Sequence, residues 1–333
     1  MLSLNDFSKK QIVFVYANEG EKIAYKNDNL IVKDKEDEIK FQVSLYRLYI
    51  VYIIGDTSLT TVILKKAKKF GFTIALLSTN FRLYEMVGDT KLGNTLLKDR
   101  QYKYSGIDIA KHIVCNKILN EINTLKNIRK KDNNVKDTIT ILNDYMAKVN
   151  SCEDYHLLLS YEGNAAKLYF KAIFDNVEWK GRKPRITFDY INSALDIGYT
   201  ILFTFIEVII NSFGFDTYVG VLHKQFYMRK SLICDFVEPF RIIIDEQLRK
   251  SINLKQIKED DFIVINGEYR LKYENSTKYA NIFLGAIINE KDKIFLYIQE
   301  YYRAFMKGKN VKYFPIYERE VFYDNSKLWY KQW

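Results

Sequence analysis

Two carboxylates and an imidazole occur in a segment whose other residues are typical of a buried helix. His223 is one of three histidines among the 333 residues, Asp235 follows it within an apolar run, and Glu238 comes three residues later. Residues three apart share a helix face, so the two acids are expected side by side. A further acid, Glu162, stands where the apolar spacing of "HLLLSYEGNAAKLYF" indicates the core. Buried carboxylates need a partner, because unpaired burial is costly.

A divalent metal ion is one partner that these residues fit. Carboxylate oxygens with a neutral imidazole suit Mg²⁺ or Mn²⁺ and leave positions for water and phosphate. A capping box is the alternative for the acid pair, with Asp235 as N-cap, Glu238 at the third helical position and Pro239 in the first turn. The residues alone leave both interpretations open.

A basic turn follows the helix that carries Glu162. The stretch "EWKGRKPR" at 178–185 contains Lys180, Arg182, Lys183 and Arg185. Such a cluster binds a phosphate backbone well, although a solvated loop often has the same composition. A salt bridge from Arg182 or Arg185 would also explain a buried Glu162.

Zinc binding is a second candidate chemistry. His112 and Cys115 are three residues apart, and Cys152 and His156 are four apart, so each pair suits one face of a helix. Nothing in the sequence requires the two pairs to meet, and packing or surface roles are the alternative. Neither GxxxxGK[ST] nor GxGxxG occurs, so a P-loop or a dinucleotide fold is not supported.

Composition indicates a soluble protein that binds a polyanion. The net charge of +10 favours nucleic acid or an anionic membrane surface as the partner, although a lysine-rich composition can simply keep a protein soluble. Three cysteines are few, and their odd number does not suit a disulfide framework. The start "MLSLNDFSKK" lacks the apolar core of a signal peptide. We therefore expect a cytoplasmic location. Cys234 adjoins Asp235, which would raise its thiol pKa, so we expect a small packing residue. The apolar stretch 195–215 carries Asp196 and Glu207 and is interpreted as a buried helix, with no membrane partner.

The residue patterns predict an α+β protein. The first ninety residues contain β-type runs at 11–17, 29–33, 41–55 and 72–78, with a helix over 58–71 that Ser58 caps and Gly71 ends. Helical spacing then predicts helices over 107–125, 137–149, 154–175, 189–213, 228–250 and 277–306, and Asn266-Gly267 predicts a hairpin turn. We therefore expect a small N-terminal β-rich domain, 1–95, followed by a larger all-α catalytic domain, 96–333. The aromatic and charged tail, 312–333, is expected to dock on the body or on a partner.

Four motifs, in this order, resemble the CRISPR-associated integrase that captures new spacers, the first and most widespread protein of CRISPR adaptation. They are Glu162, Gly163, Ala165, Ala166 and Tyr169; Asp189, Asn192, Gly198 and Tyr199; Gly220 and His223; and Ser231, Leu232, Asp235, Glu238, Pro239, Phe240 and Arg241. The resemblance is strongest over 158–245. Phe236 replaces the family's usual leucine, and "RITF" lacks the proline common before Asp189.

The resemblance implies both a ligand set and a reaction. Glu162, His223 and Asp235 would bind one Mg²⁺ or Mn²⁺ ion, and Glu238 would lie behind them and hold Arg241. A DNA 3′-hydroxyl would attack a phosphodiester of the CRISPR repeat, and the same site would cut or resolve branched DNA. The predicted DNA contacts are Lys180, Arg182, Lys183, Arg185, Lys224 and Arg229.

The resemblance also implies an assembly. The β-rich domain would form a homodimer, and a dimer of the small second CRISPR-associated protein would bridge two such dimers on protospacer and repeat DNA. Two other functions remain open. One is a stand-alone mobile-element integrase or branched-DNA nuclease with the same core, although no zinc module or helix-turn-helix extension is evident. The other is a non-catalytic DNA-binding scaffold, which the acids directed at the core argue against.

Overall fold

The computed structural model describes residues 3–17, 20–79, 81–88, 93–129, 131–175, 177–184 and 186–320. The chain divides into two compact units, one of Met1–Tyr102 with Phe203–Thr217 and one of Lys103–Leu202 with Tyr218–Trp333. The predicted α+β class, strand-rich first and helical afterwards, is confirmed. The division predicted near residue 95 falls inside the first unit, which also takes in residues 203–217 from much later in the chain. The dimerisation role of the β-rich part stays a prediction.

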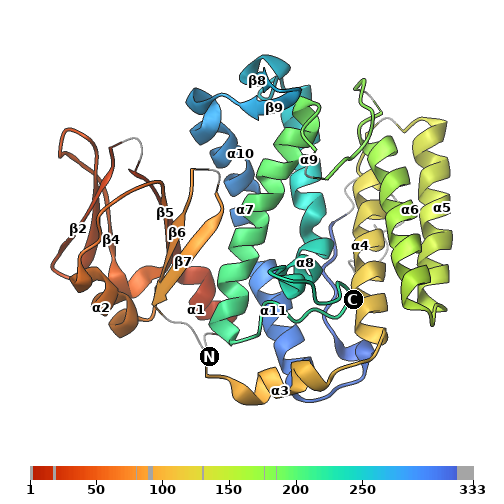
Figure 1. Ribbon diagram of the computed structural model, residues 1–333, viewed down its shortest axis with the longest axis horizontal. Coiled ribbons are helices and arrows are strands. Elements are labelled where there is room, and N and C mark those ends of the chain that lie inside the picture. Colours follow the sequence, from red (N-terminus) through yellow and green to blue (C-terminus); the bar gives the residue numbers. More distant parts are fainter. Residues whose placement is uncertain are drawn as a thin grey trace, which may run out of the picture. The chain divides into compact units, whose positions relative to one another are not determined.

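The first unit contains two sheets. Strands β1 (Gln11–Tyr16), β5 (Leu48–Ile54), β6 (Thr73–Leu77) and β7 (Leu83–Gly88) form one sheet in the order β1-β5-β6-β7. Its first three strands are parallel and β7 is antiparallel. Strands β2 (Lys22–Lys26), β3 (Asn29–Lys33) and β4 (Ile39–Ser44) form the antiparallel second sheet (Figure 1). Every residue of β5 is buried, as expected for an apolar run at the centre of a parallel sheet.

The N-terminal elements differ from the sequence prediction in detail. Helix α2 (Thr61–Phe70) is capped at Thr60 rather than Ser58, and it ends, as predicted, at Gly71 with a left-handed φ of 69°. The run over 41–55 is two strands, because the turn Leu45–Arg47 separates β4 from β5. Helix α1 (Leu4–Lys9) and strands β2 and β7 are additional elements that the patterns did not predict.

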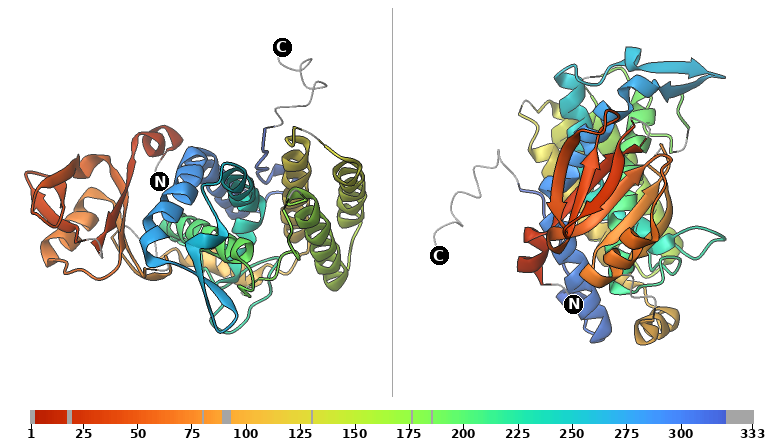
Figure 2. Two further views of the ribbon diagram at one scale, coloured as in Figure 1. Left: turned by 90° about the horizontal axis from the view of Figure 1, so that it is seen from above. Right: turned by 90° about the vertical axis from the view of Figure 1, so that its left-hand side faces the viewer.

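The second unit is built on a three-helix layer. Helices α4 (Asp108–Lys126), α5 (Asn133–Asn150) and α6 (Tyr155–Ile173) lie side by side, and the two views in Figure 2 agree with Figure 1 on this arrangement. Helix α3 (Thr95–Lys103), which precedes these helices in the chain, belongs to the first unit except for its last residue. Helix α4 is buried on most sides, so that several of its polar side chains lie in the interior. Polar groups at such positions require partners inside the protein.

Helix α7 (Tyr190–Phe213) begins in the second unit and continues into the first. It is long and apolar enough to cross a membrane, with a mean hydropathy of 1.7 in its most apolar window, but 78% of that window is buried within the protein. The burial supports the predicted core helix.

Two predicted helices are each divided. The segment predicted as 228–250 consists of α8 (Ser231–Val237), the 3₁₀ turn Glu238–Phe240 and α9 (Arg241–Asn253). Pro239 explains the break, since its ring excludes a backbone donor and crowds the preceding turn. The segment 277–306 is α10 (Ser276–Asn289) and α11 (Lys291–Met306), which meet at Glu290.

The predicted hairpin is confirmed. Strands β8 (Phe262–Ile265) and β9 (Glu268–Leu271) pair across Asn266 and Gly267, whose φ angles of 53° and 80° are those of a type I′ turn.

The chain after α11 docks along α4. Asn116 and Asn120 both donate to the carbonyl of Tyr317, and they accept from the backbone N–H groups of Tyr317 and Arg319 at 3.0 and 2.8 Å. The two amide side chains thus donate to and accept from the backbone of the extended segment 315–320, as the backbone of a neighbouring strand would. This answers the docking question for the first part of the tail, while residues 321–333 lie outside the part of the chain that the structure describes.

Candidate active site

Asp235 organises the loop that carries His223. The backbone N–H groups of Val221 and Leu222 donate to its Oδ2 at 2.6 and 3.0 Å, and that of His223 donates to its Oδ1 at 2.8 Å. The His223 ring meets Oδ1 through Nδ1 at 2.7 Å. The side chain of Asp235 is fully buried inside α8, whose N-cap position is Lys230. Asp235 is therefore not an N-cap, and the capping-box interpretation is wrong.

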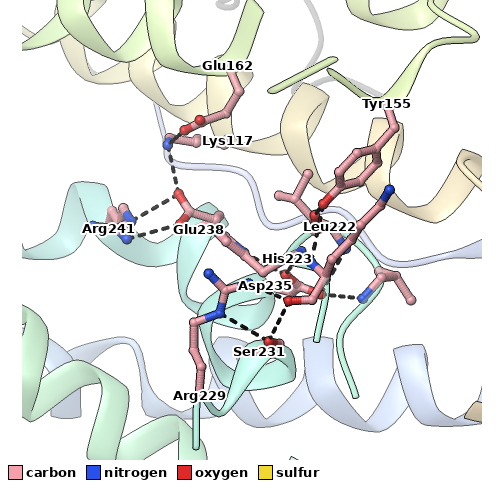
Figure 3. A network of polar contacts seen from close by, with 12 residues as sticks. Lys117, Tyr155, Glu162, Leu222, His223, Arg229, Ser231, Asp235, Glu238 and Arg241 are labelled. Atoms are coloured by element: carbon pink, nitrogen blue, oxygen red, sulfur yellow. Dashed lines mark hydrogen bonds and ion pairs between the residues drawn. The ribbon is translucent and has the colours of Figure 1, made fainter. Parts of the chain in front are cut away.

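The loop allows this close approach because Gly220 lacks a side chain. A Cβ at Gly220 would lie 2.7 Å from Oδ2 of Asp235 and 2.8 Å from the carbonyl oxygen of His223. The loop is also held from the side of α6, where the Tyr155 hydroxyl donates to the carbonyl of Leu222 and accepts from the N–H of Lys224 (Figure 3). His223 is therefore presented by a segment anchored on both sides of it.

The Asp235 contact sets the state of the His223 ring. An ionised carboxylate only accepts hydrogen bonds, so in the neutral imidazole Nδ1 carries the proton and Nε2 keeps its lone pair. A histidine oriented by a carboxylate in this way is typical of metal ligands.

Glu162 and Glu238 meet at one lysine. The ammonium group of Lys117, on α4, lies 2.7 Å from Oε2 of Glu238 and also forms an ion pair with Oε1 of Glu162 on α6. Figure 3 shows the two acids reaching Lys117 from two sides. The predicted salt bridge from Glu162 to Arg182 is wrong, because Arg182 pairs with Asp196. Arg185 lies outside the described residues.

Arg241 holds the other side of the Glu238 carboxylate. Its Nε and Nη2 donate to Oε2 and Oε1 at 2.9 and 3.0 Å, which is the contact that the sequence predicted. Burial alone would raise the pKa of Glu238, but Arg241 and Lys117 hold it well below its ordinary value. Burial alone would lower the pKa of Lys117, but Glu162 and Glu238 raise it. The site thus contains an ionised Glu238 and a charged Lys117 at neutral pH.

The arrangement fits a divalent cation in its donor chemistry. Across the described ranges, no three His, Cys, Asp or Glu side chains are gathered closely enough to hold an ion as they stand. However, oxygens of Glu162 and Glu238 converge from separate elements on a single cationic group. Hard carboxylate oxygens with an imidazole Nε2 suit Mg²⁺ or Mn²⁺. Displacement of the Lys117 ammonium would open Oε1 of Glu162 to an ion and would leave Oε2 of Glu238 bonded to Arg241 alone.

The predicted DNA contacts fall into two groups. Lys180, Lys183 and Lys224 are exposed and available to a phosphate backbone. Arg182 is largely buried, since it pairs with Asp196 and its Nη1 donates to Asn192 at 3.0 Å. Arg229 folds back onto its own loop, where its Nε donates to Ser231 Oγ at 3.2 Å. These two arginines therefore support the loops that carry their neighbours.

The structure does not bring the candidate zinc ligands together. His112 contacts the carbonyl of Pro315 at 2.8 Å, Cys115 lies 3.2 Å from Asn150 Oδ1, and Cys152 donates to the carbonyl of Asp154 at 3.0 Å. Each of these side chains packs where it lies. Cys234 is partly buried. Its thiol pKa is raised mainly by this burial and also by the negative charge of Asp235, which is the predicted direction.

Lys117 and Tyr155 are site residues that sequence reasoning missed. Lys117 stands in "VCNKILNEIN", where asparagines and acids interrupt an otherwise apolar helix. A helix with polar groups on its buried side signals internal pairing, and that signal could have found Lys117. Tyr155 directly follows the N-cap Asp154, and nothing local distinguishes it from a surface tyrosine.

The fold and the site together define a class of protein. A strand-rich first unit precedes a helical unit in which Glu162, Glu238 and an oriented His223 share one region (Figure 3). The family model described as CRISPR associated protein Cas1 matches residues 14–284. The chain belongs to this family.

Known relatives agree with this assignment. The chain is 29% identical over 280 residues to the CRISPR-associated endonuclease Cas1 2 of Rhodospirillum rubrum, covering 78% of this chain and 81% of the relative. A chain of a solved Cas6-RT-Cas1–Cas2 complex has a TM-score of 0.74 at 22% identity, covering 94% of this chain and 36% of that one. A casposase bound to its integration product has a TM-score of 0.70 at 22% identity, covering 96% and 99%. These two structures support the fold.

Proposed function

We propose that this protein is a metal-dependent DNA integrase and endonuclease that inserts protospacer DNA into a CRISPR array and also cuts or resolves branched DNA. The observation that carries the proposal is the meeting of Glu162 and Glu238 at one cationic group beside the oriented His223. Membership of the Cas1 family, in which the R. rubrum relative is named an endonuclease, supports the reaction class.

The proposed ligands are Glu162, His223 and Glu238. This assignment exchanges the roles predicted for Asp235 and Glu238. Both oxygens of Asp235 already accept from three backbone N–H groups and the His223 ring, and burial leaves no approach for an ion. A bound Mg²⁺ or Mn²⁺ would act as a Lewis acid on the scissile phosphate and help ionise the attacking hydroxyl.

The remaining residues orient and charge the site. Asp235 fixes the ring of His223, and Arg241 keeps Glu238 ionised. When an ion displaces its ammonium group from the two glutamates, Lys117 would supply positive charge near the reacting phosphate. The attacking group is a 3′-hydroxyl of the incoming DNA, which joins the phosphorus in line as the old ester oxygen leaves with the other DNA strand. The protein contributes positioning and charge, without a covalent intermediate.

The proposed partners are DNA, a second copy of this chain and the small Cas2 protein. Two attacks, one at each end of a repeat, need two active sites at a fixed separation, which favours two dimers bridged by a Cas2 dimer. The likeness to a chain from a Cas6-RT-Cas1–Cas2 complex supports Cas2 as a partner, and the proposed setting is the cytoplasm.

A stand-alone integrase of the casposase type is the second candidate. The chain covers 99% of the casposase chain, so a missing extra module does not separate the two. Target preference separates them, because a spacer integrase favours a CRISPR repeat over unrelated duplex.

A strand-transfer assay on a branched DNA that mimics a half-integrated spacer tests the proposal. We expect products with Mn²⁺ or Mg²⁺, none with EDTA, and a loss of about a hundredfold or more in Glu162→Ala. Glu178→Ala is the matched control, since this exposed acid lies just beyond α6. Equal product from Glu162→Ala and the control would refute the proposed site. Tight DNA binding without products in any sample, even with Cas2 added, would favour the scaffold function.

A further inference from the structure

Three consecutive large hydrophobic side chains project into solvent next to the candidate active site. Phe226, Tyr227 and Met228 are 71%, 87% and 71% exposed, and they follow His223 by three to five residues. Tyr227 is the most exposed of the large hydrophobic residues in the described part of the chain. Such a run is costly in water, so a cluster of this kind marks a binding surface.

The loop that carries these residues is anchored at both ends. Tyr155 holds the backbone on either side of His223, and Ser231 Oγ donates to the carbonyl of Lys224 at 3.1 Å. The N–H of Arg229 donates to the carbonyl of Phe226 at 3.0 Å and closes a turn. Met228 within that turn has a left-handed φ of 57°, a conformation that costs energy in a residue with a side chain. The tip is thus a defined turn on a fixed base.

Basic groups lie at the base of the tip. Lys224 is exposed, and its ammonium lies 4.3 Å from the centre of the Tyr155 ring. Arg229 supports the loop through Ser231, and its guanidinium, 5.8 Å from the centre of the Phe226 ring, adds positive charge there. Lys230 follows it in the chain. Exposed aromatic faces with cationic groups beside them are the combination that binds single-stranded nucleic acid, since bases stack on the rings while the cations hold the backbone.

We propose that the tip Phe226–Met228 stacks on unpaired bases of the DNA substrate and so holds a single-stranded end or junction beside His223. This inference rests on the proposed function and deepens it by naming the part of the substrate that the loop binds. Charge decides between the possible occupants. An apolar protein surface has no use for the surrounding cations, whereas an unpaired DNA strand uses both the rings and the cations.

Fluorescence anisotropy with two DNA molecules tests the inference. One is a blunt duplex, the other is the same duplex with a single-stranded 3′ overhang, and both are measured in EDTA so that no chemistry occurs. For Phe226→Ala combined with Tyr227→Ala, we expect the Kd for the overhang DNA to rise about tenfold or more while that for the blunt duplex changes less than twofold. Tyr227→Phe keeps the ring and is expected to bind as the wild type does.

The matched control is Tyr273→Ala, in the same unit, because Tyr273 is 65% exposed but lies far along the chain from His223. A 2-aminopurine base in the overhang gives an independent signal, since stacking on a ring quenches its fluorescence. We expect quenching with wild type and Tyr273→Ala and its loss in the double variant.

Two results would overturn the inference. One is equal affinity of the double variant and wild type for the overhang DNA, especially if the variant has lost self-association or Cas2 binding in size-exclusion chromatography, which would assign the tip to a protein surface. The other is equal weakening for both DNA molecules, which would show that the rings contribute to duplex binding and not to the binding of unpaired bases. If wild type gives no strand transfer but the double variant selectively loses affinity for the overhang DNA, the proposed function fails and the loop inference stands.

Discussion

Asp235 and Glu238 lie three residues apart, yet their carboxylates have opposite environments. The carboxylate of Asp235 accepts hydrogen bonds from backbone N–H groups of the His223 loop, whereas that of Glu238 pairs with the cationic groups of Lys117 and Arg241. The spacing of the two acids predicts that they share a helix face. It does not predict which of them accepts from backbone N–H groups, because those groups belong to the loop around His223, earlier in the chain. For this reason the sequence identified the acids and the histidine of the site, while the structure is needed to propose their separate roles.

Lys117→Met tests whether the lysine stands in for a cation. Removing Lys117 leaves Glu162 without this partner and Glu238 with Arg241 alone, so we expect a loss of about 3 kcal/mol in the free energy of unfolding in EDTA. Mn²⁺ is expected to restore more stability to this variant than to wild type, since the ion replaces the missing charge. Urea unfolding with and without Mn²⁺ measures both quantities. An equal gain from Mn²⁺ in the two proteins would contradict the idea.

Glu121→Gln tests the buried acid one helical turn after Lys117. Burial, only partly offset by Lys117, raises the pKa of Glu121 to about 8, and its Oε2 has no hydrogen-bond partner among the described residues. A raised acid pKa means that the folded protein binds the proton more tightly than the unfolded chain does. Stability is therefore lost as the pH rises from about 4.5 towards 8.

Glutamine mimics the protonated acid at every pH. We expect Glu121→Gln to equal wild type near pH 4.5 and to exceed its stability at pH 9 by up to a few kcal/mol. Urea unfolding of both proteins at the two pH values provides the comparison. A difference between the two proteins that does not grow with pH would show that Glu121 is ionised in the folded protein throughout this range.

At the scale of elements, period and turn chemistry predict most of the secondary structure. The hairpin at Asn266-Gly267 and the end of α2 at Gly71 follow from local backbone preference. The break at Pro239 was missed because the apolar spacing continues through it into α9. The asparagine contacts between α4 and the segment 315–320 join residues about two hundred positions apart, which no local pattern predicts.

Asn120→Leu tests these contacts. Asn120 is fully buried, donates to the carbonyl of Tyr317 and accepts from the N–H of Arg319, both at 2.8 Å. Leucine would leave the N–H of Arg319 without this partner and would remove one of the two amide donors to the Tyr317 carbonyl, the other being Asn116. We therefore expect a loss of about 2 kcal/mol in the free energy of unfolding and faster proteolysis within 315–320. Asn143→Leu, at an exposed position of α5, is the control and is expected to change little. Equal stability of the two variants would show that Asn120 does not hold the segment 315–320.

At the scale of the whole molecule, composition and order of elements predict a β-rich part followed by a helical part, and this is confirmed. They do not predict that residues 203–217 return to the first unit, because one continuous helix, α7, contributes to both units. The candidate active site is built entirely from the second unit, on elements that begin with α4 and end with α9. The resemblance to the spacer integrases could therefore be recognised from the second unit's motifs alone.

The most direct test of the account is the yield of DNA joining as a function of Mn²⁺ concentration for wild type, Glu238→Gln and the exposed control Glu178→Gln. We expect no joining without the ion and a saturable rise in joining for wild type and the control. Glu238→Gln is expected to need about tenfold or more additional Mn²⁺, because one of its ligands has lost its charge. A Glu238→Gln curve that superimposes on wild type would contradict the proposed role of Glu238. Joining that proceeds equally in EDTA would contradict the metal-dependent reaction itself.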